Sequence, residues 1–269
     1  DQHQSINPHQ SINPHQSINQ YDSRINPNDP NLSGVFRQTS IEVDDYHKSR
    51  IPDDKSKHFL YFLKYIMYAE GQIENLKKND LATKKNFNCE DAFRLFIDNN
   101  ESQISPVELK EGLRLLGLNC TDYEIQLLFK RFDSNNNGYI DFPEFFDMLV
   151  PFEKAYRDMV EKRRPNSCCP CKSPDIFTPD TIESLKNVFK LIISHEIKIN
   201  ELRQRLHLYA SSSSDISQFI SYMKERNKIE DLIEYCKHIG IYTNEREANL
   251  LFIRLDRRKQ KIFDIHSLD

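Results

Sequence analysis

The segment from Asp133 to Glu144 carries oxygen-bearing side chains at regular intervals. Calcium is a hard cation that prefers about six to eight oxygen ligands. Gly138 permits a sharp turn in the middle of the segment, because glycine tolerates a positive φ. The spacing predicts a metal site whose ligands are the side chains of Asp133, Asn135, Asn137, Asp141 and Glu144 and the backbone carbonyl of Tyr139. With only three acidic ligands, the expected dissociation constant is on the order of 10⁻⁷–10⁻⁵ M or weaker.

Helices with apolar faces are expected on both sides of this segment. Thr121 and Glu124 have the spacing of a capping box, which should open a helix leading into the segment. A second capping box, from Ser105 to Glu108, should open an earlier helix. A helix over residues 142–149 should follow the segment, and Ile140 should join a short ribbon with a partner segment.

Residues 87–150 resemble the EF-hand pair of the calmodulin and centrin superfamily. The first hand reads from Asp98 to Glu108, and the interval from its Ile104 to Ile140 is usual for paired hands of that family. This first loop is one residue short and lacks the glycine, so Asp98 and Glu108 cannot both keep their ligand positions. Two roles stay open for it: binding calcium, or supplying only the partner ribbon and a shared core.

The C-terminal third resembles a degenerate copy of the same unit. The segment from Gly240 to Asp256 repeats the pattern from Gly117 to Asp133. The residues at the later ligand positions are unsuited to a cation, and they are Arg258, Gln260, Lys261 and Ser267. The hand before it, around residues 222–233, has Lys224 and Arg226 where oxygens are needed, so both loops should be metal-free.

The predicted fold is all-α, with two tandem EF-hand pairs, the second degenerate, small β-ribbons, a long linking helix and a low-complexity N-terminal tail. The expected parts are a tail (1–57), a helix (58–84), an EF-hand pair with one competent loop (85–162), a linker (163–177), a long helix (178–210) ended by the serines Ser211–Ser214, and a degenerate EF-hand pair (211–269).

Three features outside the loops leave alternatives open. The tail begins with a repeat of His-Gln-Ser-Ile-Asn-Pro, which is either disordered or an arm that threads along a partner. Cys168, Cys169 and Cys171 are part of a zinc site, acceptors for lipid, or an inert linker. His195 is expected to be a surface or partly buried histidine, and the basic run at residues 162–164 a solvated helix end rather than a nucleic-acid patch.

The composition and the motifs argue against several classes of protein. The net charge of −4 does not point to nucleic acid or to an anionic membrane, and no apolar run approaches the ~20 residues of a membrane helix. The sequence lacks a phosphate-binding loop, G-x-S-x-G and H-E-x-x-H, and we expect no enzymatic activity. The sparse cysteines favour reduced thiols in the cytoplasm. No secretory signal is evident, although the chain begins at Asp1, so its true N-terminus is open.

Two classes of function follow from these features. In the first, calcium stabilises one lobe of a structural protein that docks onto a larger assembly. The Asn- and Gln-rich tail and the degenerate lobe resemble EF-hand proteins of ciliates and related protists, which implies a ciliary axoneme as location and tubulin or other axonemal proteins as partners. In the second, the chain is a calmodulin-like sensor that grips a target helix or regulates an enzyme.

Overall fold

The computed structural model describes residues 57–97, 101–166, 173–208, 210–226 and 228–256. All of them belong to one compact unit, Ser49–Asp269, and the other unit, Asp1–Lys48, falls wholly outside the described residues. The predicted tail, apart from Lys57, and the whole cysteine cluster therefore lie outside the described part of the chain. None of the helices within that part has the length and apolar character needed to cross a bilayer.

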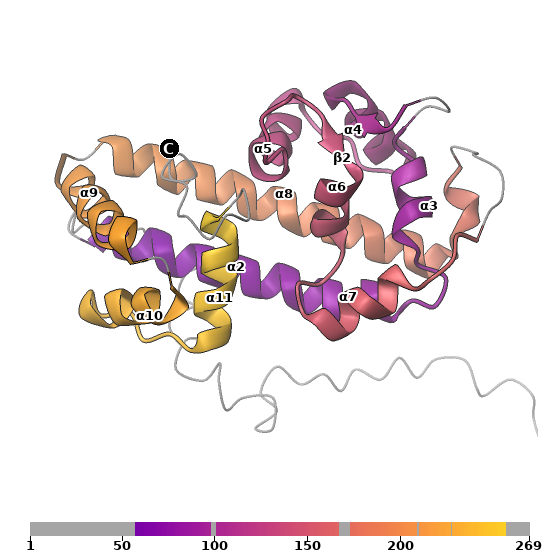
Figure 1. Cartoon of the computed structure of the whole chain (residues 1–269). Helices are drawn as coiled ribbons and strands as arrows, with labels where there is room; N and C mark the ends of the chain where they lie inside the picture. The colour runs from indigo at the N-terminus through magenta and orange to yellow at the C-terminus, as the bar shows by residue number, and fades with distance from the viewer. Residues whose placement is uncertain (1–56, 98–100, 167–172, 209, 227, 257–269) are drawn as a thin grey trace, which may run out of the picture. The chain divides into compact units, whose positions relative to one another are not determined.

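The described residues are mostly helical (Figure 1). The first half contains α2 (His58–Asn79), the short 3-10 helix η2 (Leu81–Thr83), α3 (Cys89–Arg94), β1 (Gln103–Ile104), α4 (Pro106–Leu115), α5 (Asp122–Phe132), β2 (Ile140–Asp141), α6 (Phe142–Leu149) and α7 (Lys154–Glu161). The second half contains η3 (Pro174–Ile176), α8 (Pro179–Leu208), α9 (Ala210–Glu225), α10 (Ile229–His238) and α11 (Glu245–Leu255).

The long helices α2 and α8 lie side by side and run antiparallel (Figure 1). Near one end of the pair, the Ser184 hydroxyl donates to Asp80 at 2.8 Å, and further along the Tyr65 hydroxyl lies 2.9 Å from Nδ1 of His195. Tyr65 precedes Asp80 in α2, whereas its partner His195 follows Ser184 in α8, so the two helices run in opposite directions. The surface or partly buried position predicted for His195 is wrong: only 3% of this residue is exposed, because α2 covers it.

A two-stranded ribbon joins the two predicted hands. Strands β1 and β2 are antiparallel, and Ile104 faces Ile140 in the register. Both predicted capping boxes are present, with Ser105 and Glu108 at the start of α4 and Thr121 and Glu124 at the start of α5. These local patterns fix the helix starts as expected from the sequence.

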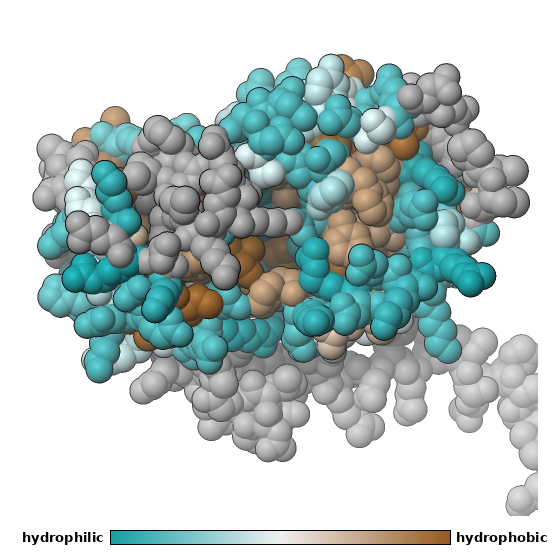
Figure 2. Space-filling view, viewed as in Figure 1, coloured by the Kyte–Doolittle hydropathy of each residue, from teal (hydrophilic) through white to brown (hydrophobic). Residues whose placement is uncertain are grey.

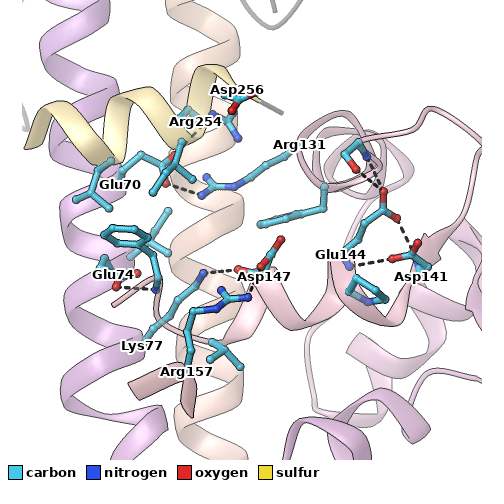
Figure 3. A pocket seen from close by; sticks show the side chains of 18 of the residues that line it. Glu70, Glu74, Lys77, Arg131, Asp141, Glu144, Asp147, Arg157, Arg254 and Asp256 are labelled. Carbon is cyan, nitrogen blue, oxygen red and sulfur yellow. Dashed lines mark hydrogen bonds and ion pairs between the residues drawn. The ribbon is translucent and has the colours of Figure 1, made fainter. Parts of the chain in front are cut away.

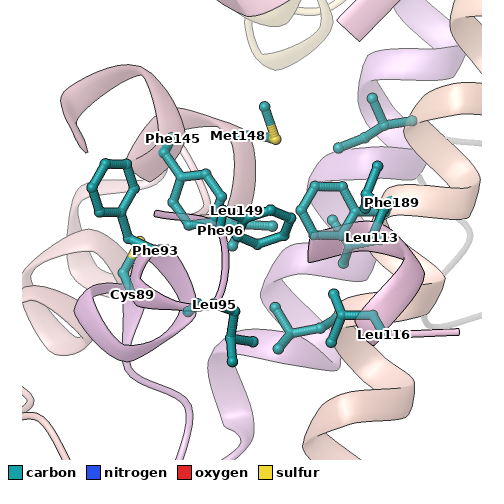
Figure 4. Packing of buried hydrophobic residues seen from close by; sticks show 14 of the residues in the cluster. Cys89, Phe93, Leu95, Phe96, Leu113, Leu116, Phe145, Met148, Leu149 and Phe189 are labelled. Atoms are coloured by element: carbon teal, nitrogen blue, oxygen red, sulfur yellow. The ribbon is translucent and has the colours of Figure 1, made fainter. Parts of the chain in front are cut away.

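Apolar side chains from both hands and from α8 fill the core of the first half (Figure 4). The ring of Phe145 in α6 lies 5.3 Å from the rings of both Phe93 and Phe96. Phe96 also contacts Phe189 of α8, at 5.7 Å between ring centroids. The long helix is therefore part of this core and not only a linker.

Two expectations about the connections need correction. The four serines do not end the long helix: α8 stops at Leu208, and Ser211–Ser214 lie in the first turns of α9, where serine is well tolerated. The basic run is a solvated helix end only in part, because Lys162 and Arg164 are exposed and Arg163 is half-buried. Its guanidinium donates to the backbone carbonyls of Ala82, Lys84 and Phe87, and it ties the end of α7 to the connection after η2.

Candidate metal centre

Asp133 begins the predicted metal loop directly after the last turn of α5. Its backbone N–H donates to the Phe129 carbonyl at 2.9 Å, which ends the helix. Its carboxylate accepts from the N–H of Asn137 at 3.1 Å and from the N–H of Gly138 at 2.9 Å. Asp133 is 6% exposed, so the loop backbone curls around this carboxylate.

The two predicted amide ligands hold the turns of the loop. The Asn135 side-chain oxygen accepts from the Asn137 N–H at 2.9 Å, and that of Asn137 accepts from the Tyr139 N–H at 2.8 Å. These contacts are turns in which a short side chain replaces a backbone acceptor. The side-chain oxygens therefore lie along the loop, in reach of its backbone.

The turn of the loop depends on two residues in the left-handed region. Gly138 has a φ of 82° and Asn136 a φ of 56°. Glycine carries no penalty there, and asparagine is the side chain that tolerates this conformation best. Gly138 thus has the role predicted for it.

Asp141 and Glu144 form a capping box at the start of α6. The Glu144 N–H donates to the Asp141 carboxylate at 2.9 Å, and the Asp141 N–H donates to Glu144 Oε2 at 3.1 Å. The other Glu144 oxygen accepts from the N–H of Ser134 at 2.8 Å and from its hydroxyl at 2.7 Å. Glu144 is 7% exposed and joins the two ends of the loop.

The donor set fits a hard cation. The predicted ligands are carboxylate, amide and backbone carbonyl oxygens, which calcium prefers, and the set has no sulfur or nitrogen ligand. Tyr139 is exposed and lies in the loop, immediately before strand β2. Its backbone carbonyl is the predicted ligand. Among the described residues no three His, Cys, Asp or Glu side chains are gathered as a metal cluster. Binding at this loop would depend on Asn135, Asn137 and the backbone as well as on the acids.

The loop of the first hand is described only in part. Asp98 lies outside the described residues, whereas Glu108 caps α4 through its contacts with the Ser105 N–H (2.8 Å) and hydroxyl (2.6 Å). Glu108 therefore occupies the same place on its helix as Glu144 does on α6.

The sequence of this region matches a known family. Residues 102–150 match the family model of an EF-hand domain pair. The match identifies an EF-hand domain pair over these residues only. Domains of this kind generally bind calcium, which agrees with the oxygen ligands of the loop. No solved structure matches the chain.

The C-terminal segment has a glycine turn and a helix start like those between α4 and α5. Gly240 has a φ of 83° and Gly117 a φ of 79°, and Asn244 starts α11 with a capping box as Thr121 starts α5. The substituted ligand positions after Asp256 lie outside the described residues. At the preceding hand only residues 226–228 separate α9 from α10, which is too short for an EF-hand calcium loop.

A pocket of about 540 Å³ lies beside the metal loop (Figure 3). The loop lines it with Ser134, Asn135, Asp141 and Glu144, and α11 lines another side. Figure 2 shows apolar surface exposed in the hollow between polar regions of this face. Among the apolar lining residues, Phe152 and Ile253 are 37% and 40% exposed.

Sequence reasoning missed four charged side chains that lie together, each at most 13% exposed, and three of them line this pocket. Arg131 contacts Glu70 at 2.8 Å and Glu196 at 2.6 Å, and Arg254 contacts Glu196 at 2.7 Å and Glu70 at 3.6 Å. Burial by itself would raise the pKa of the Glu196 carboxyl, but Arg254 and Arg131 outweigh it and hold the pKa below its ordinary value. The available signal was a glutamate on each long helix, Glu70 in α2 and Glu196 in α8, among buried residues that are mainly apolar.

Proposed function

We propose that this chain is a calcium-binding structural protein with a metal site at Asp133–Glu144. In this proposal calcium stabilises the EF-hand pair, and the pair holds a helix of its own chain. The folded unit then docks onto a larger protein assembly. The chain carries out no catalysis in this proposal.

The observation that carries the proposal is the position of α8. Leu185, Val188, Phe189 and Ile192 are each no more than 1% exposed and belong to the same cluster as Phe96 and Phe145 of the hands. Their spacing of three, four and seven residues is that of a helix bound in an apolar groove. The surface on which a sensor would grip a target is filled by the protein itself, which favours a structural role for calcium.

The sensor and enzyme-regulator alternatives require a different response to calcium. Both need apolar surface to become available for a partner helix, and α8 would have to leave the core for this to happen. A calmodulin-like role is therefore the contrary outcome of the experiment below.

A calcium titration of the full chain tests the proposal. Binding is measured by calorimetry, and exposed apolar surface by a dye that brightens on it. Asp133→Ala with Glu144→Gln removes two ligands, and Glu161→Gln, on the exposed end of α7, is the matched control. We expect wild type and the control to bind calcium with no rise in dye signal, and the double variant not to bind.

Two results would contradict this expectation in different ways. A saturable rise in dye signal that the double variant lacks would replace the structural role with the sensor. An absence of binding heat in wild type would remove the calcium site itself.

The assembly remains a prediction from the sequence resemblance to ciliate-type axonemal proteins. Sedimentation of the full chain with stabilised microtubules tests it, with serum albumin as a protein that stays in the supernatant. Recovery of the chain in the pellet would support tubulin as a partner. A chain that stays with albumin would direct the search to other assemblies.

A further inference from the structure

The two halves of the described chain are built on the same plan. Each has a long helix, α2 or α8, followed later by a pair of helices joined at a glycine with positive φ. The turn after α4 is closed by the Leu118 N–H bonding the Leu113 carbonyl at 2.8 Å, and the turn after α10 by the Ile241 N–H bonding the Cys236 carbonyl at 2.7 Å. Arg131 and Arg254 thus occupy equivalent positions, each two residues before the aspartate that ends its helix.

The halves exchange one helix of each pair, the helix that follows the glycine turn. Helix α5 of the first half packs along α8 of the second, and α11 of the second half packs along α2 of the first. Figure 1 shows α11 crossing α2 and α5 lying over α8. Neither half can therefore form its full set of contacts without the other.

The exchange brings the four charges together at the centre. Each arginine contacts the glutamates of both long helices, and the side chains of Arg131 and Glu196 are only 6% and 5% exposed. Removing one member would leave a buried charge without its full complement of partners, and such a loss is costly. The positions of α5 and α11 are therefore linked through Glu70 and Glu196.

The metal loop begins at this cluster. Arg131 lies in the last turn of α5, and Asp133 ends that turn through its bond to the Phe129 carbonyl. The pocket is lined by loop residues Ser134 and Glu144 together with Arg254 (Figure 3). A shift of α11 would move Arg254 and so disturb Glu70 and Glu196, which also contact Arg131. Because Arg131 lies in the last turn of α5, the disturbance would reach Asp133, the first predicted ligand.

We propose that Arg254 is a positioning residue for the calcium loop, so that calcium bound at Asp133–Glu144 also stabilises α11. The proposal rests on the proposed calcium site. Because coupling between two sites is reciprocal, a change at Arg254 must alter calcium affinity even though this residue is not a ligand. The C-terminal half would then respond to calcium without a competent loop of its own.

Hydrogen exchange of the full chain, with and without saturating calcium, tests the coupling. We expect calcium to slow exchange in residues 122–149 and also in α11. Arg254→Lys keeps the charge but loses the planar fork that spans two carboxylates, and it should weaken calcium binding about fivefold or more. Glu245→Gln, at the exposed start of α11, is the control and should leave calcium affinity unchanged.

The outcomes separate this inference from the proposed function. Calcium binding that protects only residues 122–149, with the affinity of Arg254→Lys equal to that of wild type, would overturn the coupling and leave the calcium site intact. A wild-type chain that binds no calcium would overturn both. If Arg254→Lys does not fold, the exchange of α11 in wild type decides the question alone.

Discussion

Gly112 of α4 lies directly against the ring of Phe96. A Cβ at this position would overlap the ring atoms of Phe96, which is 1% exposed. The ring has no room to move away, because Phe145 and Phe189 contact it on other sides. The glycine is therefore required by the packing of α4 against the core.

Gly112→Ala should destabilise the protein although alanine favours helices. Overpacking costs about 1–3 kcal/mol, and the gain in helix propensity offsets about 1 kcal/mol of it. Gly71 in α2 is a matched control, because a Cβ there would meet no atom within 4 Å. Gly71→Ala should stabilise by about 0.5–1 kcal/mol. Urea unfolding measures both changes, and equal effects of the two substitutions would refute the close packing at Gly112.

Gly138→Ala should reduce both stability and calcium affinity. Its φ of 82° costs an alanine about 1–2 kcal/mol. Gly117→Ala, at a φ of 79° between α4 and α5, should lower the free energy of unfolding by a similar amount. It lies outside the loop and should leave calcium affinity unchanged. Calorimetric titration measures the calcium affinity of both variants. A Gly138→Ala protein with wild-type calcium affinity would argue against this loop as the calcium site.

Lys77 should make stability depend on pH in alkaline solution. Burial lowers the pKa of its ammonium from the ordinary 10.5 to about 8, and Glu74 offsets only part of this effect. Between these values the folded chain has lost a proton that the unfolded chain still holds. Stability from this group therefore rises with pH across that window, by up to about 3 kcal/mol.

Lys77→Met removes this contribution. The free energy of unfolding of wild type minus that of the variant should therefore increase as the pH rises from 8 to 10.5. Unfolding in urea at a series of pH values measures it. Lys78→Met leaves Lys77 and its bond to the Asp147 carbonyl in place and should keep the wild-type pH dependence. A difference that stays constant with pH would contradict the expected titration of Lys77.

Phe189→Ala should destabilise the protein by about 3–5 kcal/mol, because it leaves a cavity between α8 and the hands. Leu208→Ala, on the same helix but 77% exposed, should change stability by less than about 0.5 kcal/mol. Thermal and urea unfolding provide the comparison. A small effect at Phe189 would mean that the EF-hand pair is stable without α8.

Most of the EF-hand pair follows from local patterns in the sequence. Capping boxes such as Ser105 with Glu108 and Thr121 with Glu124, the turn at Gly138 and the pairing of Ile104 with Ile140 were predictable. They depend on residues close in the chain or on a spacing that defines the loop. The assignment of ligands in Asp133–Glu144 has the same basis.

The sequence by itself determined the EF-hand pair, its candidate loop and the presence of long helices, because helix caps and loop turns are set by short-range spacing. Only the tertiary structure decided where the helices lie. It placed α8 in the core of the hands, and it buried Glu196, which in the sequence only interrupts an apolar series. That glutamate is stabilised by Arg131 and Arg254, which are far from it in the chain. Contacts of this kind depend on packing between distant segments, and no local pattern encodes them.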